Sequence, residues 1–444
     1  GLLMQPFNTI SGKDFDLAHL LNPGFLLGSF LVALVAGFIA GIYPAFFLSS
    51  FKAVNILKGE VTKGKKSGGL RRVLVITQFV LSIFLAVSGI IIYSQMQHMR
   101  NLDMGYDQED LIYIPVTENF EPKYNAIKGE LIRNPLIEKV SASSLNPVFI
   151  GSNSSGVDWE GKDPELDVLF SYNHVDYDLI ETMKYQIVEG RSFSRDYPGD
   201  MPADTMANFI VNEELVRIMG VDDPVGRWFR FQGYRGEIVG VLKDFHFQSA
   251  RSKIEPLAIN LEHPERFNYI MIRLSDTNPQ GAVAAVRDIW ERTIPDYPLT
   301  FEYADENINE MYAGELRMSR LFKYFTILAT LIAALGLYGL SSFIAERRTR
   351  EIGIRKIMGS SVSRVVVLLS TEFLYLVLIA AVIGFPLSYL YLNNWLKDFP
   401  YRIDIGAGVF LIVGFGALLI SLLTVSFQSY RAAVINPAKA IQRE

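Results

Sequence analysis

The sequence predicts a multi-pass α-helical membrane protein that carries a folded α+β domain outside the membrane. Two observations lead to this prediction. Half of the 444 residues are hydrophobic, and long stretches contain no Lys, Arg, Asp or Glu. The charges are also unevenly divided, because residues 96–318 hold 21 basic and 38 acidic residues whereas the rest of the chain holds 21 basic and 9 acidic residues.

Five segments are long and apolar enough to cross a membrane. About 20 apolar residues are needed to span roughly 30 Å of hydrocarbon. Buried helices of a soluble protein rarely extend that far without a charge, so a large soluble protein is disfavoured. The sequence predicts membrane helices at 24–49, 72–97, 320–345, 366–393 and 406–430, of which the fourth is interrupted by a single acid, Glu372.

The short segments between these helices indicate the orientation. Residues 52–72 contain seven basic residues and one acidic residue, and residues 346–364 contain six basic and two acidic residues. Short basic loops stay on the cytoplasmic side of a membrane. Alternation of the helices then places residues 98–318 on the outer side, which for a bacterial inner membrane is the periplasm.

Residues 98–318 alternate short apolar runs with helix-like stretches, as an α+β or α/β domain would. Strands are expected at 111–116, 209–211, 236–241, 269–274 and 299–303, and helices at 123–133, 175–183, 213–219 and 280–293. Segments 143–167 and 194–207 are rich in Ser, Asn, Gly, Pro and Asp, which predicts loops.

No arrangement in the sequence predicts catalysis. The chain has no cysteine, and His174, His246 and His263 lack metal-ligand spacing. Asp244 and His246 could form an acid–base pair, but a packing or turn role is favoured. A phosphate-loop-like string from Gly59 to Lys65 lacks the Ser or Thr and the strand–helix context that nucleotide binding requires.

The two ends of the chain resemble each other. Residues 44–58 and 428–442 each consist of a helix end followed by a short basic tail with a closing aliphatic residue. The similarity suggests a duplication. We therefore expect residues 1–60 to be the last membrane helix and cytoplasmic tail of a preceding repeat, and the native chain to extend further toward its N-terminus.

One cytoplasmic segment is the most informative part of the sequence. Residues 346–360 read ERRTREIGIRKIMGS, in which apolar residues alternate with basic ones, as in an amphipathic helix at a membrane surface. The string resembles the E-R-x-x-E-I-G-I-x-K-x-x-G-x-S signature of FtsX-like permeases of the MacB type of ABC transporter. Residues 436–441, NPAKAI, are similar to the closing N-P-x-x-A-L of that family, and strings in the outer domain match as well, most closely those of duplicated Bacteroidetes-type permeases.

The resemblance implies a domain organisation. Residues 61–97 would form a basic loop and a membrane helix, residues 98–318 a MacB-type periplasmic core domain, and residues 319–444 an FtsX-like three-helix membrane domain with a coupling segment at 346–364. Residues 1–60 would close a preceding repeat. Residues 72–444 then make up one whole permease unit.

The resemblance also implies a function. ATP would be bound and hydrolysed by a partner ABC ATPase, so this chain is expected to be no enzyme and to hold no cofactor. The chain would couple that hydrolysis to movement of the outer domain, for export or mechanotransmission. The expected coupling residues are Glu346, Arg347, Arg350, Glu351, Ile352, Gly353, Ile354, Arg355, Lys356 and Gly359, with the arginines and Lys356 facing acidic grooves of the partner and Ile352 and Ile354 entering an apolar socket.

Other partners are expected from the same resemblance. They are a second permease unit or homodimer, membrane lipids and a periplasmic adaptor or hydrolase, with no nucleic acid. Three alternatives stay open: a regulator of a periplasmic cell-wall hydrolase, a lipoprotein-releasing permease, and a membrane sensor without an ATPase. Glu372 is either functional or a headgroup-level partner of Arg364 or of an arginine in the coupling segment.

Overall fold

The computed structural model describes residues 4–5, 8, 16, 18, 21–49, 65–116, 120–305 and 312–434. The chain divides into two compact units. The membrane unit consists of Gly1–Met96, Gly314–Leu396 and Ile403–Glu444, and the outer unit consists of Gln97–Ala313 and Lys397–Arg402. The string around Gly59, most of the duplicated tails and the 436–441 motif lie outside the described residues.

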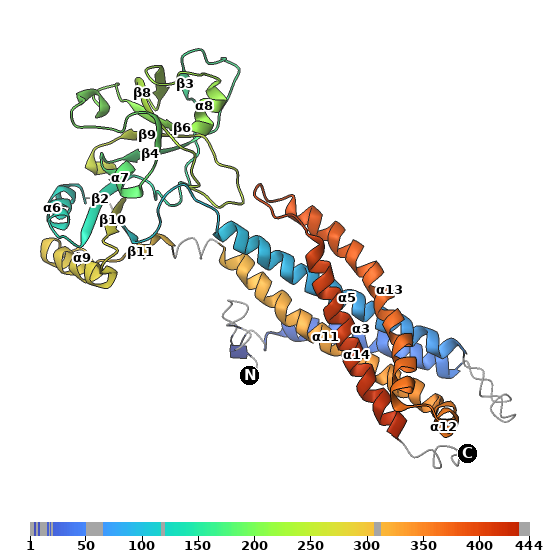
Figure 1. Cartoon of the computed structure of the whole chain (residues 1–444). Coiled ribbons are helices and arrows are strands. Elements are labelled where there is room, and N and C mark those ends of the chain that lie inside the picture. Colours follow the sequence, from blue (N-terminus) through green and yellow to red (C-terminus); the bar gives the residue numbers. More distant parts are fainter. Residues whose placement is uncertain are drawn as a thin grey trace. The chain divides into compact units, whose positions relative to one another are not determined.

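Long apolar helices make up the membrane unit (Figure 1). Four described helices are long and apolar enough to cross a membrane, and they coincide with the predicted spans that begin at 72, 320, 366 and 406. The predicted span at 24–49 also forms a helix, of which Pro23–Phe38 is a shorter apolar stretch. The helices are α3 (Pro23–Ser49), α5 (Lys65–Arg100), α11 (Ala313–Arg347), α13 (Val362–Leu396) and α14 (Ala407–Val434), and a short helix, α12 (Thr349–Ile357), lies between α11 and α13.

A periodic stripe on α5 forms the centre of the membrane unit. Buried residues recur at every fourth position of this helix, which places them on one face: Val75, Phe79, Ile83, Val87 and Ile91. They pack with Ala333 and Leu337 of α11 and with Phe373 and Val377 of α13. Large apolar side chains elsewhere on these helices are exposed, as expected for surfaces that meet lipid.

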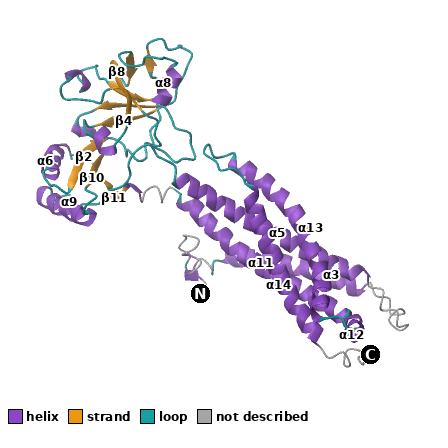
Figure 2. Ribbon diagram, in the orientation of Figure 1, coloured by secondary structure: helices purple, strands orange, loops and turns teal. Residues whose placement is uncertain are grey.

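The outer unit is built on one mixed β-sheet (Figure 2). Its order is β11-β1-β10-β2-β4-β9-β6-β8-β7-β3, and β5 pairs with β8. Two strand pairs, β4 with β9 and β6 with β8, are parallel and the other pairs are antiparallel. The strands are β1 (Leu111–Pro115), β2 (Ile137–Ser143), β3 (Asp158–Trp159), β4 (Ser171–Val175), β5 (Ile187–Gly190), β6 (Phe209–Asn212), β7 (Trp228–Phe231), β8 (Tyr234–Leu242), β9 (Leu257–Leu261), β10 (Tyr269–Leu274) and β11 (Glu302–Tyr303).

Helices cover the sheet and create its cores. Near one end, α6 (Glu121–Ile132) and α9 (Pro279–Thr293) pack against β1, β2 and β10 through a cluster that includes Ile127 and Trp290. A second cluster contains α7 (Leu179–Met183) together with Phe245 and Phe247. A third contains α8 (Glu213–Met219) and aromatic residues of β6 and β7. The predicted fold class, a multi-pass membrane protein with an α+β outer domain, is therefore confirmed.

The outer unit differs from the sequence prediction in its strands. The predicted helix at 175–183 is in fact the last residue of β4 followed by the short helix α7, and the predicted strand at 299–303 is reduced to two residues. Strands β2, β3, β4, β5, β7 and β9 were not predicted, and β3 lies within the predicted loop at 143–167. Most of them contain Gly, Ser, Asn, Asp or Lys, and their pairing with neighbouring strands compensates for this weak local propensity, whereas β7 is short but rich in aromatic residues that favour strands.

Candidate functional site: the inner coupling segment

The coupling segment contains one short helix, α12, which short turns join to the membrane helices α11 and α13. Helix α11 ends at Arg347, α12 runs over Thr349–Ile357 and α13 begins at Val362. Arg348 links the first two helices without a gap in hydrogen bonding, because its N–H donates to Ile344 O at 3.0 Å and its carbonyl accepts from Ile352 N at 2.9 Å. Gly359 ends α12 with φ = +87°, a conformation that favours glycine at a helix C-terminus.

Helix α12 has one face against the protein and one face exposed. Ile352 is 7% exposed and packs with Val365 and Leu369 of α13, so it is not available to a partner's socket, contrary to expectation. Ile357 and Met358 are instead 65% and 81% exposed. The short helix is therefore packed on α13 through Ile352, and large apolar side chains are exposed at its C-terminal end.

Ion pairs fix the base of this segment. Arg348 Nη2 lies 3.2 Å from Glu372 Oε2, and Arg72 of α5 pairs with the other oxygen of the same carboxylate. Glu372 therefore joins α5, α13 and the α11–α12 turn. Of the expected partners, it takes an arginine of the coupling segment, and Arg364 is not among its ion pairs in the described part of the chain.

The remaining predicted residues lie around α12. Arg355 and Glu351 form an ion pair along the helix at 2.8 Å, and both are about half exposed. Ile354 is exposed, and Glu346 is an exposed residue near the end of α11. The side chains of Arg347, Arg350, Gly353 and Lys356 lie outside the described residues. Sequence reasoning did not single out Arg72 or Arg348, although both were counted in the basic loops.

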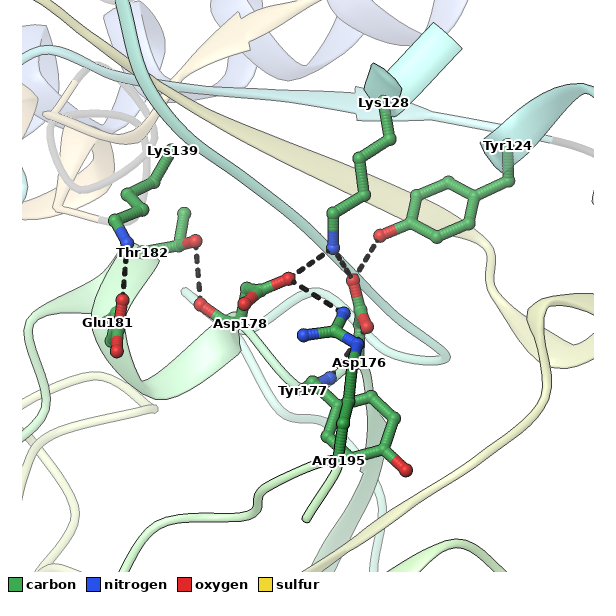
Figure 3. A network of polar contacts seen from close by, with 9 residues as sticks. All are labelled: Tyr124, Lys128, Lys139, Asp176, Tyr177, Asp178, Glu181, Thr182 and Arg195. Carbon is green, nitrogen blue, oxygen red and sulfur yellow. Dashed lines mark hydrogen bonds and ion pairs between the residues drawn. The ribbon is translucent and has the colours of Figure 1, made fainter. Parts of the chain in front are cut away.

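The outer unit also contains a cluster of charged residues, centred on the turn between β4 and α7 (Figure 3). Lys128 of α6 pairs with both Asp176 and Asp178, Tyr124 donates its hydroxyl to Asp176, and Arg195 Nη2 lies 3.3 Å from Asp178. Burial alone would raise the pKa of Asp178, but the hydrogen bonds from Lys128 and Arg195 lower it. The charges satisfy one another, which is typical of a structural cluster.

The histidines form no reactive site in the described structure. His174 Nδ1 lies 2.8 Å from Asn260 Oδ1, and His246 packs edge-on against Tyr401. Asp244 instead accepts hydrogen bonds from Asn212 and from the backbone of Glu214. No group of three or more His, Cys, Asp or Glu residues that could hold a metal ion occurs among the described residues.

Two family models match this chain. The model described as MacB-like periplasmic core domain matches residues 74–289, and the model described as FtsX-like permease C-terminal matches residues 324–437. The second match includes the coupling segment and Glu372. The chain belongs to the MacB/FtsX-type permease family. Its outer unit is accordingly the extracytoplasmic domain of a multi-pass membrane protein.

Individual relatives are distant from this MacB/FtsX-type permease. The macrolide export ATP-binding/permease protein MacB of Chromobacterium violaceum is 23% identical over 296 residues, which cover 63% of this chain and 44% of that protein. This chain thus spans less than half the length of that curated relative.

Three solved structures are similar to part of this chain. The periplasmic region of MacB from Actinobacillus actinomycetemcomitans has a TM-score of 0.33 at 12% identity and covers 50% of this chain and 97% of that one. A domain of a putative permease from Porphyromonas gingivalis has a TM-score of 0.31 at 18% identity and covers 44% and 90%. The extracellular domain of the noncanonical ABC-type transporter YknZ from Gram-positive bacteria has a TM-score of 0.29 at 13% identity and covers 43% and 97%.

Proposed function

We propose that this chain is the permease subunit of an ABC transporter of the bacterial inner membrane, and that it couples ATP hydrolysis by a separate ATPase to movement of its outer domain. The observation that carries the proposal is the form of α12. Ile354 and Ile357 of this helix and Met358 directly after it are exposed, while Ile352 anchors the helix to the membrane unit. ATP belongs to the partner in this proposal, and the chain itself supplies a docking surface instead of catalytic groups.

The ion pairs of Glu372 support a path for the coupled movement. When a bound ATPase displaces α12, Arg348 moves with it. The ion pairs of Glu372 then pass this displacement to α13 and, through Arg72, to the start of α5. Each exposed pair is worth only about 0–1 kcal/mol by itself. Two pairs to one carboxylate, together with the buried contact of Ile352, connect the three elements more firmly than either pair alone.

Further partners follow from the same proposal. Transporters of this kind work with a second permease unit, either a homodimer or the preceding repeat, and the exposed apolar faces of α11, α13 and α14 suit such a unit or lipid. A periplasmic adaptor or hydrolase would contact the outer unit. Export and mechanotransmission both require the same coupling step.

A co-purification experiment tests the proposal. The affinity-tagged chain is extracted from its native cells in mild detergent, and co-purifying proteins are identified by mass spectrometry. We expect an ABC ATPase in the wild-type preparation. Ile357→Glu should reduce its recovery by at least about tenfold, the effect of 1.4 kcal/mol on a binding equilibrium, because a carboxylate replaces an exposed apolar contact.

A matched variant controls for general damage. Ile132→Glu makes the same change at a half-exposed position of the outer unit and should leave the recovery of the ATPase unchanged. Absence of any ABC ATPase from an intact wild-type preparation would overturn the proposal. Equal recovery with Ile357→Glu and Ile132→Glu would instead remove α12 as the docking element.

A further inference from the structure

Residues 244–251 of the outer unit contact both of the chain segments that connect this unit to the membrane helices α5 and α11. After α5 ends, Met104 accepts a hydrogen bond from His246 N at 2.8 Å. The next residue, Gly105, lies so close to Phe245 that a Cβ on Gly105 would be 2.7 Å from the Phe245 Cβ. Before α11 begins, the hydroxyl of Tyr312 accepts a hydrogen bond from Ala250 N at 2.8 Å.

The loop between α13 and α14 also contacts this segment. Residues Lys397–Arg402 belong to the outer unit, although both helices that flank them belong to the membrane unit. Phe399 is 2% exposed, and the guanidinium carbon of Arg251 lies 5.3 Å from the centre of the Phe399 ring. The rings of Tyr401 and His246 meet edge-on, with 4.9 Å between their centres. The loop is therefore part of the packing of the outer unit and not a free turn.

The same segment is joined to the centre of the sheet. The carboxylate of Asp244 accepts hydrogen bonds from Asn212 Nδ2 at 3.0 Å and from Glu214 N at 2.9 Å, at the junction of β6 and α8. Asn212 is fully buried, and its side-chain oxygen accepts from the backbone of Leu215 and Leu257. The segment is therefore connected through Asp244 to the end of β6 and the start of α8, and Asn212 in turn is hydrogen-bonded to the first residue of β9.

The helix side of the connection is similarly fixed within the membrane unit. Ile403, which follows the α13–α14 loop, donates its N–H to the side chain of Gln95 in α5 at 2.9 Å. Gln95 is fully buried. The loop thus has one end held by α5 and its middle held by residues 244–251.

We propose that residues 244–251 form a relay, in which one segment collects the displacements of α5, α11 and the α13–α14 loop and passes them to the β6–α8 junction of the outer sheet. This inference deepens the proposed coupling function and rests on it. The relay requires no covalent step. It requires only that the three contacts on this short segment are rigid. The segment after α5 is held by the hydrogen bond from His246 N and by the close approach of Gly105 to Phe245. The segment before α11 is held by the hydrogen bond from Ala250 N to the Tyr312 hydroxyl, and the α13–α14 loop by the buried ring of Phe399.

Hydrogen exchange of the full chain, without any ATPase, tests whether the contacts act as a unit. Tyr312→Phe removes only the hydroxyl that accepts from Ala250. We expect exchange to become about three- to tenfold faster at Ala250, the effect of losing one hydrogen bond of about 1 kcal/mol, and also faster in residues 397–402. Phe399→Ala should in turn increase exchange at residues 246–251.

A second tyrosine gives the control. Tyr124→Phe removes a buried hydroxyl bond to Asp176 in the charged cluster, and it should leave exchange in residues 397–402 unchanged. If Tyr312→Phe and Phe399→Ala each change exchange only at their own contact, the three contacts are independent and the relay is refuted. That result would stand whether or not an ATPase binds the chain.

The transmission itself is tested in the co-purified complex with ATP and vanadate. Wild-type complex should change its exchange in residues 212–215 on trapping, and Phe399→Ala should remove at least half of that change while the ATPase remains bound. An unchanged response in both relay variants would overturn the relay and leave the coupling function intact. No response of the wild-type outer unit at all would contradict the coupling function as well as the relay that depends on it.

Discussion

Replacing Arg273 with Met is expected to destabilise the outer unit more than any surface substitution. Arg273 on β10 is 2% exposed, and its guanidinium donates to three backbone carbonyls, those of Thr182, Glu109 and Asp107, at 2.7, 2.8 and 2.7 Å. Burial lowers the pKa of Arg273, and the negative charge of Asp107 opposes that effect. The side chain thus holds the residues that lead into β1 against α7.

The expected cost follows from these contacts. A hydrogen bond from a charged donor contributes about 1.5–3 kcal/mol. Burying the guanidinium costs several kcal/mol, so the three bonds do not add in full. With Met the burial cost disappears, but three carbonyls lose their donor. A buried carbonyl without a donor costs about 1–3 kcal/mol, so for three carbonyls, with the burial cost of the guanidinium removed, we expect a net loss of about 3–5 kcal/mol.

Amide exchange of the full chain in detergent measures this loss. Protected amides of β1 and β10 should exchange about a hundred- to a few-thousand-fold faster in Arg273→Met, since each 1.4 kcal/mol corresponds to a factor of ten. Arg292→Met is the matched control, because Arg292 and its ion-pair partner Asp288 are both largely exposed on the outer unit. Less than a fivefold difference between the two variants would refute the reasoning.

Two further outcomes are expected. Gly105→Ala should destabilise the outer unit by more than Gly156→Ala. Both glycines have φ near +80°, but only at Gly105 would the new Cβ clash with Phe245. Equal melting temperatures of the two variants would contradict this. Burial alone would raise the pKa of Asp200, but the hydrogen bonds from Arg191 and its other donors lower it. This carboxylate therefore stabilises the fold above its unfolded pKa of about 3.9, and the stabilisation is lost as the pH falls further toward the folded pKa. Denaturation measured from pH 7 to 3 should show a decline below about pH 4 that Arg191→Met makes smaller, and an equal decline in that variant would exclude the pair as its cause.

Several features of this protein followed from the sequence because they depend on local composition. Membrane helices need only length and apolarity, so α5, α11, α13 and α14 were located within a few residues, apart from their extensions beyond the membrane. Helices α8 and α9 were equally predictable, since each begins with an Asn whose side chain accepts a hydrogen bond from the first turn. The family signature in residues 346–360 lies within one continuous stretch and needs no fold to be read.

Other features depended on contacts between residues far apart in the chain, and only the tertiary structure decided them. The alternation of apolar and basic residues in α12 did not reveal that Ile352 faces α13 while Ile357 and Met358 are exposed, because that depends on how the α11–α12 turn is oriented. The partners of Glu372 are 300 and 24 positions away. The sequence indicated only a packing or turn role for Asp244 and His246, and the contacts of residues 244–251 with Tyr312 and with the α13–α14 loop exist only because the fold brings these segments together.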